Sequence, residues 1–231
     1  MARRRVNTTK LEIIQTATRM FLENGYSTTS IKAIANALDM STGHLTFYFP
    51  AKEHLLAELV DMLCSFQWAL MKQYVQEGES LLMAICLELT SMAAICEENE
   101  IAKDFFISAY THSLTLEIIR KNDAQRAKLV FAEYCPDWSD KQFAEVETLV
   151  SGVEYATLMT TGDSAPIDMR ISGALNNIMM LYQVPEEMRR QKIQRALSMD
   201  YRAIGRTVLQ EFMAYIEETN EQAFEELLRR K

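Results

Sequence analysis

Apolar residues recur at helical spacing along nearly the whole chain. The first set that shares one helical face comprises Leu11, Ile14, Ala17, Phe21 and Leu22. This spacing predicts an amphipathic helix over residues 9–24, capped by Thr8 or Thr9. Asn24-Gly25 should end the helix, because both residues tolerate the left-handed conformation that commonly follows one. The preceding residues, 1–7, are expected to form a disordered basic arm.

Two short helices are predicted next. Thr29 and Ser41 are the expected N-caps of helices over 30–37 and 42–48, since hydroxyl side chains accept hydrogen bonds from the first N–H groups of a helix. Asp39-Met40 should form the short turn between them. The expected inward positions are Ile31, Ile34, Ala35 and Leu38 in the first helix, and Leu45 and Phe49 in the second.

The helical pattern continues to the end of the sequence. After a break at Pro50-Ala51, helices are expected over 52–75, 80–97, 101–120, 123–134, 140–161, 167–182, 186–198 and 200–229. The predicted breaks are Glu98-Asn99, Asn122, Pro136-Asp137, Gly162-Asp163-Ser164, Pro185 and Ser198. Only seven Gly and four Pro occur in 231 residues, and so few breakers favour long helices over a turn-rich β fold. The predicted fold class is therefore all-α.

Charge is divided unevenly along the chain. The net charge is −8, which by itself argues against binding a polyanion. Residues 1–55, however, carry seven Lys or Arg against four Asp or Glu, a net charge of +3, so residues 56–231 carry −11. The sequence thus indicates a basic head on an acidic body, with any polyanion binding confined to the head.

Several protein classes are disfavoured. No run of 18 apolar residues predicts a membrane span, and no apolar stretch follows the basic start to make a secretory signal. The cysteines, Cys64, Cys86, Cys96 and Cys135, are widely spaced. They are expected to be reduced core thiols of a cytoplasmic protein, with a regulatory thiol as the alternative.

Signatures of enzymes are also missing. The sequence holds no G-x-G-x-x-G, P-loop, H-E-x-x-H or C-x-x-C motif, and its three histidines lack metal-ligand spacing. We therefore expect no enzymatic activity, no cofactor and no metal site.

The first three helices form the candidate functional element. A supporting helix followed by two short helices with a three-to-four-residue turn is the helix-turn-helix arrangement. In that arrangement the second helix of the pair, here 42–48, enters the major groove of DNA. Leu45 would anchor this helix, and Gly43 would let its backbone approach DNA closely.

An ordered set of motifs over residues 9–56 resembles the TetR family of bacterial transcriptional regulators, with an AcrR-like N-terminal helix-turn-helix. The motifs are Phe21-Leu22-Glu23-Asn24-Gly25-Tyr26, Thr29-Ser30, Ile34-Ala35, Ser41-x-Gly43-x-Leu45 and Tyr48-Phe49-Pro50-x-Lys52-Glu53-x-Leu55. The resemblance implies a DNA-binding domain over 1–55 and a helical effector-binding and dimerisation domain over 56–231. It also implies a homodimer that represses from a palindromic double-stranded operator until a small-molecule effector binds.

The same resemblance assigns candidate DNA contacts. The recognition-helix positions fall on Thr42, Gly43, His44, Thr46, Phe47 and Tyr48. Thr28, Thr29 and Ser30 resemble the phosphate-contacting start of the preceding helix, and Lys52 resembles the phosphate-contacting lysine of the fourth. Phosphate contacts fix the register on DNA, and base contacts set the sequence preference. Arg3, Arg4 and Arg5 would reach the minor groove, add nonspecific attraction or remain a solvated tail.

This head departs from the family pattern at several positions. Asp39 stands where the turn usually has Gly, Thr46 where a Tyr is usual, and Phe47 lacks a hydroxyl for a phosphate. Thr42 replaces a residue that is often basic. These changes predict weaker or differently specified DNA binding. The alternative is a TetR-like protein that binds a protein partner instead of DNA.

The body is implied to hold an effector pocket. Its candidate lining residues are soft or aromatic: Met83, Cys86, Phe105, Phe106, Tyr110, His112 and Tyr155. The same residue types also fill ordinary cores, so plain core packing is the alternative for each.

Two later helices, 140–161 and 167–182, are apolar on more than one face and carry small residues. A four-helix dimer interface is their expected use, with internal burial as the alternative. The amphipathic segment 200–231 should pack on its own body or extend that interface; a partner-binding helix is the alternative. An effector would favour a dimer whose recognition helices no longer lie ~34 Å apart.

Overall fold

The computed structural model describes residues 2–229, excepting the side chains of residues 2–7, 227 and 228. Over these residues it contains eleven helices and no strand, which confirms the all-α prediction. The helices are α1 (Ala2–Asn24), α2 (Ile31–Ala37), α3 (Thr42–Tyr48), α4 (Lys52–Gln76), α5 (Leu81–Glu98), α6 (Glu100–Thr111), α7 (Ser113–Phe131), α8 (Asp140–Leu158), α9 (Ile167–Leu181), α10 (Glu186–Ser198) and α11 (Tyr201–Arg229). None of the described helices is both long and apolar enough to cross a membrane.

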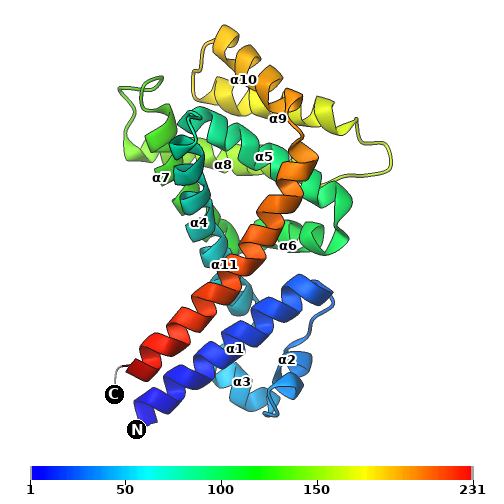
Figure 1. The fold of residues 1–231 in the computed structure, drawn as a ribbon, viewed down its shortest axis with the longest axis vertical. Helices are drawn as coiled ribbons and strands as arrows, with labels where there is room; N and C mark the ends of the chain where they lie inside the picture. Colours follow the sequence, from blue (N-terminus) through cyan, green and yellow to red (C-terminus); the bar gives the residue numbers. More distant parts are fainter. Residues whose placement is uncertain (1, 230–231) are drawn as a thin grey trace.

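The head consists of α1, α2, α3 and the start of α4, at the lower end of the molecule in Figure 1. Most of its inward residues are those that the periodicity predicts, although Ile13, which is not among them, is also fully buried. Phe21, Ile34, Leu45 and Leu55 have no exposed surface, and Phe49 is 3% exposed. Burial of each such side chain contributes roughly 1.5–3 kcal/mol, which fixes the short helices α2 and α3 that could not persist alone.

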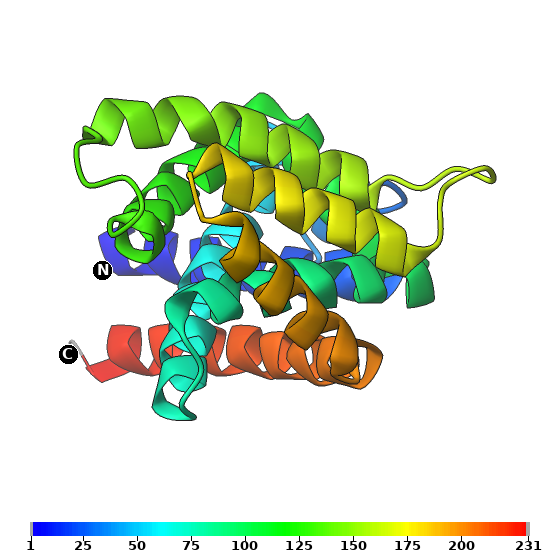
Figure 2. The same ribbon diagram turned by 90° about the horizontal axis from the view of Figure 1, so that it is seen from above.

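The remaining helices form the body, and α4 runs from the head into it (Figure 1). α11 packs along α5 and α4 and then reaches α1 of the head. Seen from above, α11 lies along one edge of the molecule, and α1 is in contact with it (Figure 2). The prediction that the C-terminal segment packs on its own chain is therefore confirmed for residues 201–229, while 230–231 lie outside the described residues.

Gly205 sets the close packing of α11 on α5. A Cβ at this position would lie 3.1 Å from the Ser91 carbonyl oxygen and 3.3 Å from Ile95. A larger residue would push the two helices apart, because a packed interior has little room to yield.

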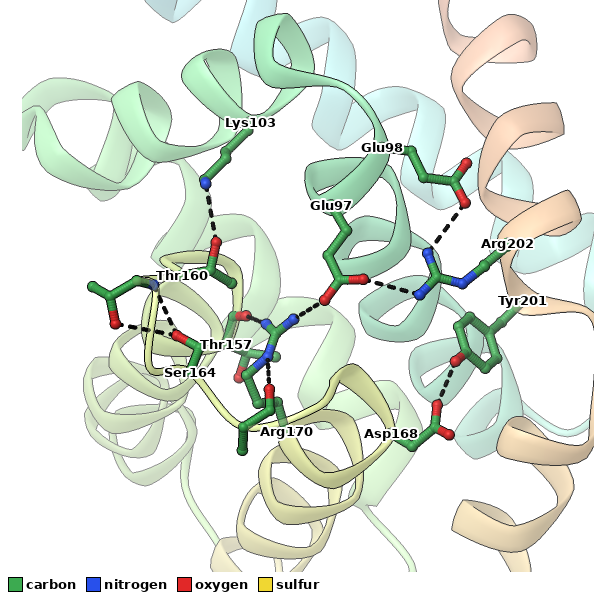
Figure 3. A network of polar contacts seen from close by, with 12 residues as sticks. Glu97, Glu98, Lys103, Thr157, Thr160, Ser164, Asp168, Arg170, Tyr201 and Arg202 are labelled. Atoms are coloured by element: carbon green, nitrogen blue, oxygen red, sulfur yellow. Dashed lines mark hydrogen bonds and ion pairs between the residues drawn. The ribbon is translucent and has the colours of Figure 1, made fainter.

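Polar contacts hold the start of α11 in place (Figure 3). Arg202 donates to Glu97 at 2.9 Å and to Glu98 at 3.2 Å. Arg206 also donates to Glu98, and Arg170 of α9 donates to Glu97. We call these five residues the exposed charge network. In it every carboxylate has an arginine partner, and hydrogen bonds from the arginines lower the pKa of Glu98.

The starts of two helices differ from the sequence-based predictions. α1 begins at Ala2, so the expectation of a disordered arm is wrong for the backbone of residues 2–7, where no Gly or Pro interrupts the helix. The side chains of Arg3, Arg4 and Arg5 lie outside the described residues. Ser30, not Thr29, is the N-cap of α2.

The predicted break at Asn122 is also wrong. The chain breaks instead at His112, whose backbone is extended, and α7 continues through Asn122. Asn122 is held in the helix because its side chain accepts a hydrogen bond from Trp68 Nε1 at 2.7 Å.

Candidate nucleic-acid interface

Local chemistry shapes the turn before α3 and the start of that helix. Asp39 has φ of 49°, the left-handed conformation that this residue type tolerates. The predicted cap is present, since Ser41 Oγ accepts a hydrogen bond from His44 N at 3.1 Å. The turn therefore survives the replacement of its usual glycine.

α3 presents one apolar anchor inward and several side chains outward. Leu45 is fully buried, whereas Thr42 and His44 are exposed and Phe47 is 77% exposed. Gly43 has no atom within 4 Å of where its Cβ would stand, so the outer face of the helix is open at that point. The Phe47 ring is therefore available for contact with a partner of the head.

Tyr48 organises the aromatic side chains of α3. Its ring packs edge-on against Phe47 with centroids 5.4 Å apart, and lies 5.5 Å from the His44 ring. Thr46, half-buried, donates its hydroxyl hydrogen to Gly43 O at 3.2 Å. The outward-facing group on α3 is thus aromatic rather than basic.

The start of α2 corrects part of the predicted phosphate site. Thr29 is 3% exposed and its hydroxyl donates to Gly25 O at 2.7 Å, so a phosphate contact by this side chain is wrong. Thr28 is exposed, yet its hydroxyl hydrogen goes to Asn24 O. Ser30 keeps the predicted geometry, because its oxygen only accepts, from Ala33 N at 3.1 Å.

Lys52 makes its hydrogen bonds within the head. Its ammonium donates to Tyr26 O at 2.8 Å and to Thr29 O at 3.0 Å, and it lies 4.0 Å from the centre of the Tyr26 ring. Burial lowers the pKa of this amine. Two of its three N–H groups are therefore used in fastening α4 to the α1–α2 turn, and a phosphate contact remains a prediction only for the third.

The turn between α1 and α2 contacts α6 of the body through Ser27 and Asp104 and through Tyr26 and His112, and we call these contacts the joint. Asp104 accepts hydrogen bonds from the backbone N and the hydroxyl of Ser27, the former at 2.8 Å. The His112 ring stands edge-on to Tyr26 at 5.3 Å. Gly25, with φ of +92°, lies so near Asp104 that a Cβ would come within 3.0 Å of its carboxylate. Movement of α6 therefore has a direct path to the head.

Comparison with known proteins agrees with this geometry. Residues 13–59 match the family model described as bacterial regulatory proteins of the TetR family. Residues 13–59 of the head are therefore similar to the DNA-binding part of that family. The HTH-type transcriptional regulator YuxN of Bacillus subtilis is 31% identical over 96 residues, which are 42% of this chain and 32% of YuxN. The probable regulator YttP of the same organism is 37% identical over 57 residues, 23% of this chain and 28% of YttP.

The matched part thus spans about a third of the length of these curated relatives. Solved structures extend the likeness in fold. RolR, crystallised without ligand, gives a TM-score of 0.60 at 16% identity over 79% of this chain and 95% of its own. The Thermus thermophilus TetR-family repressor FadR, in complex with lauroyl-CoA, gives 0.56 at 16% identity over 77% and 96%.

The predicted effector-pocket residues lie mostly in the core. Met83, Cys86, Phe105, Phe106 and Tyr110 are at most 9% exposed. His112 faces Tyr26, and Tyr155 is half-buried against the core. None of the seven lines one of the three cavities described for this structure. Their role in binding an effector stays a prediction, because soft and aromatic side chains fill a core as readily as they line a pocket.

Sequence reasoning missed a group of charges inside the body. It consists of Glu88 on α5, Asp123 and Arg126 on α7, and Glu147 and Glu154 on α8, which we call the buried acidic cluster. Arg126 is 2% exposed and donates to both Glu88 oxygens and to Asp123 at 3.2 Å. One arginine therefore serves two of four carboxyl groups.

Glu147 and Glu154 meet hydroxyls instead of cations. The Tyr182 hydroxyl donates to Glu147, and the Tyr110 hydroxyl donates to Glu154 at 3.0 Å. Burial raises the pKa of Glu147 to about 8 and that of Asp123 to about 6, and it raises the pKa of Glu154 well above its usual range. The surroundings of the cluster thus favour neutral acids on α8.

A signal for this cluster does exist in the sequence. Glu88 is the only charged residue between Leu81 and Cys96, and Glu147 and Glu154 share the inward face of α8 with Val150. Charged residues on an otherwise apolar stripe are rarely buried without a function.

All four cysteines are buried and unbridged, as the sequence predicts. Burial raises the pKa values of Cys64, Cys86 and Cys96 to about 12, which leaves them as unreactive thiols at neutral pH.

Proposed function

We propose that this protein is a homodimeric transcriptional repressor that binds a palindromic DNA operator through α3 and releases it when a small effector binds the body. The observation that carries the proposal is α3 itself: a capped, Leu45-anchored helix whose outer face is exposed and belongs to a TetR-type head. A helix of this kind fits the major groove, which is wide enough for one α-helix.

The outward residues of α3 suit base reading by shape and apolar contact. His44 and Thr42 offer hydrogen bonds to base edges, and Phe47 offers its ring to thymine methyl groups. Ser30 and the N-terminal end of α2 provide N–H and O–H donors for phosphate. Since Thr28, Thr29 and Lys52 are engaged within the head, we infer fewer phosphate contacts and a weak dependence of affinity on salt.

An exposed stripe along α8, its C-cap residue and α9 supports the homodimer. Its apolar members are exposed by 42% or more: Leu149, Met159, Met169 and Met180. Gly152 and Gly173 lie on the same two helices with no atom within 4 Å of a notional Cβ. Small residues between large apolar ones allow two helices of a second copy to approach closely. We assign this stripe to the four-helix interface.

The joint at α6 supports the ligand response. Asp104 and His112 contact the head, while Tyr110 between them contacts Glu154 of the body. An effector that displaces Tyr110 would therefore tilt the head and change the spacing of the two recognition helices.

Selection of bound duplexes from a random pool tests the proposal. We expect an enriched palindrome whose half-sites lie about one helical turn apart. Phe47→Ala and His44→Ala should relax the base preference by about 1–3 kcal/mol at single positions, because they remove base contacts.

Leu129→Ala is the matched control, since Leu129 is also an exposed apolar residue, 52% exposed, but lies on α7 of the body. It should leave the selected sequence unchanged. If no duplex is enriched at low salt, the operator-binding proposal fails and a protein partner for α3 takes its place.

A further inference from the structure

The buried acidic cluster carries more negative groups than its own chain can neutralise. Glu88 and Asp123 share Arg126, and Glu88 also accepts from Gln67 at 2.6 Å. Glu147 and Glu154 have no cationic partner among the described residues. The neighbouring Arg120 donates its Nε–H to the Ser151 hydroxyl at 2.9 Å rather than to either carboxyl group. Keeping two extra acids inside a body is costly unless something else binds them.

Two buried atoms in the cluster lack hydrogen-bond partners within the described part of the chain. They are Glu147 Oε2 and Arg126 Nε, on residues that are each 2% exposed. Both residues line a cavity of about 30 Å³ between α5, α7, α8 and α9. This volume holds roughly two water molecules or one ammonium group. A buried carboxyl oxygen that faces a cavity without a partner is available, once ionised, to accept a hydrogen bond from a donor that a ligand brings.

We propose that this cavity is the head of the effector site and that the effector is an organic cation: a primary ammonium group, seated against Glu147 and Glu154, that carries an apolar body. This inference rests on the proposed function and names the ligand class of its sensor. An ammonium group has three N–H donors, enough for the two carboxylates and one further acceptor.

The walls of the cavity fit the apolar part of such a ligand. They include Leu89, Met92, Phe131, Val150 and Ile178. Met92 is an unbranched side chain that can move aside, so the cavity can lengthen to receive a ring or a short alkyl chain. Four carboxyl groups and one guanidinium, that of Arg126, line the cavity. An anionic ligand would face this excess of acids, which gives the site its charge selectivity.

The cluster is connected to the head through one helix. Glu154 accepts a hydrogen bond from Tyr110 of α6. Asp104 of the same helix and His112, which follows its last residue, both contact the head. When an ammonium group takes over Glu154, the Tyr110 hydroxyl loses its acceptor and α6 is released from α8. Binding of a ligand at this cavity can therefore shift α6 and, through it, the head.

Calorimetry on the DNA-free protein tests the inference separately from operator binding. The probes are three ammonium ions of increasing size, methylammonium, benzylammonium and phenethylammonium, with 2-phenylethanol and phenylacetate as neutral and anionic counterparts of the last. We expect saturable binding of at least one ammonium ion, and none of the alcohol or the anion. Because the acids are protonated when empty, binding should release about one proton and tighten from about pH 6 to about pH 8.

Glu147→Gln and Glu154→Gln should each weaken ammonium binding at least about tenfold. Glu98→Gln, in the exposed charge network, is the matched control and should leave it unchanged. The inference is overturned if no ammonium ion binds, if the alcohol binds equally well, or if the glutamine variants keep full affinity. In those cases the cavity holds water only, and an operator selected independently would still support the proposed function.

Discussion

The body contains two groups of charged side chains that differ in exposure and in the balance between arginines and carboxyl groups. In the exposed charge network Glu97 and Glu98 are paired with three arginines at the surface. In the buried acidic cluster only Glu88 and Asp123, two of the four carboxyl groups, are paired with Arg126. Solvent screens the first group, whose pairs contribute little each. The second group cannot be screened, so its imbalance raises pKa values and leaves polar atoms without partners.

The contrast teaches that balance, rather than the number of charges, separates structural from functional groups here. The exposed charge network fastens α11 to α5 and α9 with its charges complementary (Figure 3). The buried acidic cluster is worse than an apolar core for stability alone. A chain that retains it therefore gains something other than stability, which we assign to ligand binding.

The largest effect is expected when the arginine of each group is removed. Arg126→Met leaves Glu88 and Asp123 buried without a cation and should cost about 3–5 kcal/mol of unfolding free energy. Arg202→Met, at the surface, should cost about 1 kcal/mol or less. Chemical denaturation of both variants measures the difference. Equal losses of unfolding free energy in the two variants would contradict the claimed difference between the buried acidic cluster and the exposed charge network.

A smaller effect is expected from pH. The pKa of Glu147 is raised from 4.5 to about 8 in the folded protein, so the folded state binds the proton more tightly than the unfolded one. The resulting stabilisation is fully present below about pH 4.5 and is lost as pH rises through about 8. Glu147→Gln should remove this loss, on the order of 3 kcal/mol across the window.

The measurement is the unfolding free energy of the wild type minus that of Glu147→Gln, followed from about pH 5 to about pH 9. Glu98→Gln provides the comparison from the exposed charge network. The pKa of Glu98 is lowered, so its contribution should be lost only in acid, below this window. A wild-type difference that stays flat with pH would contradict the raised pKa of Glu147.

The smallest effect is expected at the joint between head and body. Asp104→Asn removes the charge that accepts from Ser27 and should cost about 1–2 kcal/mol. It should also weaken the link between effector and DNA, because α6 holds the head less firmly. Asp163→Asn, at an exposed turn where the carboxylate accepts from Thr161, is a local control that should leave both quantities unchanged. Identical behaviour of the two variants would remove α6 from the proposed route.

The helices of the head were predictable from sequence because local signals agreed there. Ser41, Asp39 and Leu45 each act as their residue types suggest. The phosphate-contacting side chains of the head were less predictable. Thr29 and Lys52 donate to backbone carbonyl groups that only the fold brings near them. In the body, Met83 and Phe105 have the composition of a pocket but the position of a core. Glu88 and Arg126 meet only in three dimensions, 38 residues apart.

The most direct test of the account measures how phenethylammonium changes the affinity for the selected operator, in the wild type and in Glu147→Gln. The account predicts that saturating ammonium weakens wild-type binding at least about tenfold, the lower range of coupling energies between two sites, and leaves the variant unaffected. If the ammonium ion binds the body and the operator affinity of the wild type does not change, the cluster is not the effector sensor of this protein.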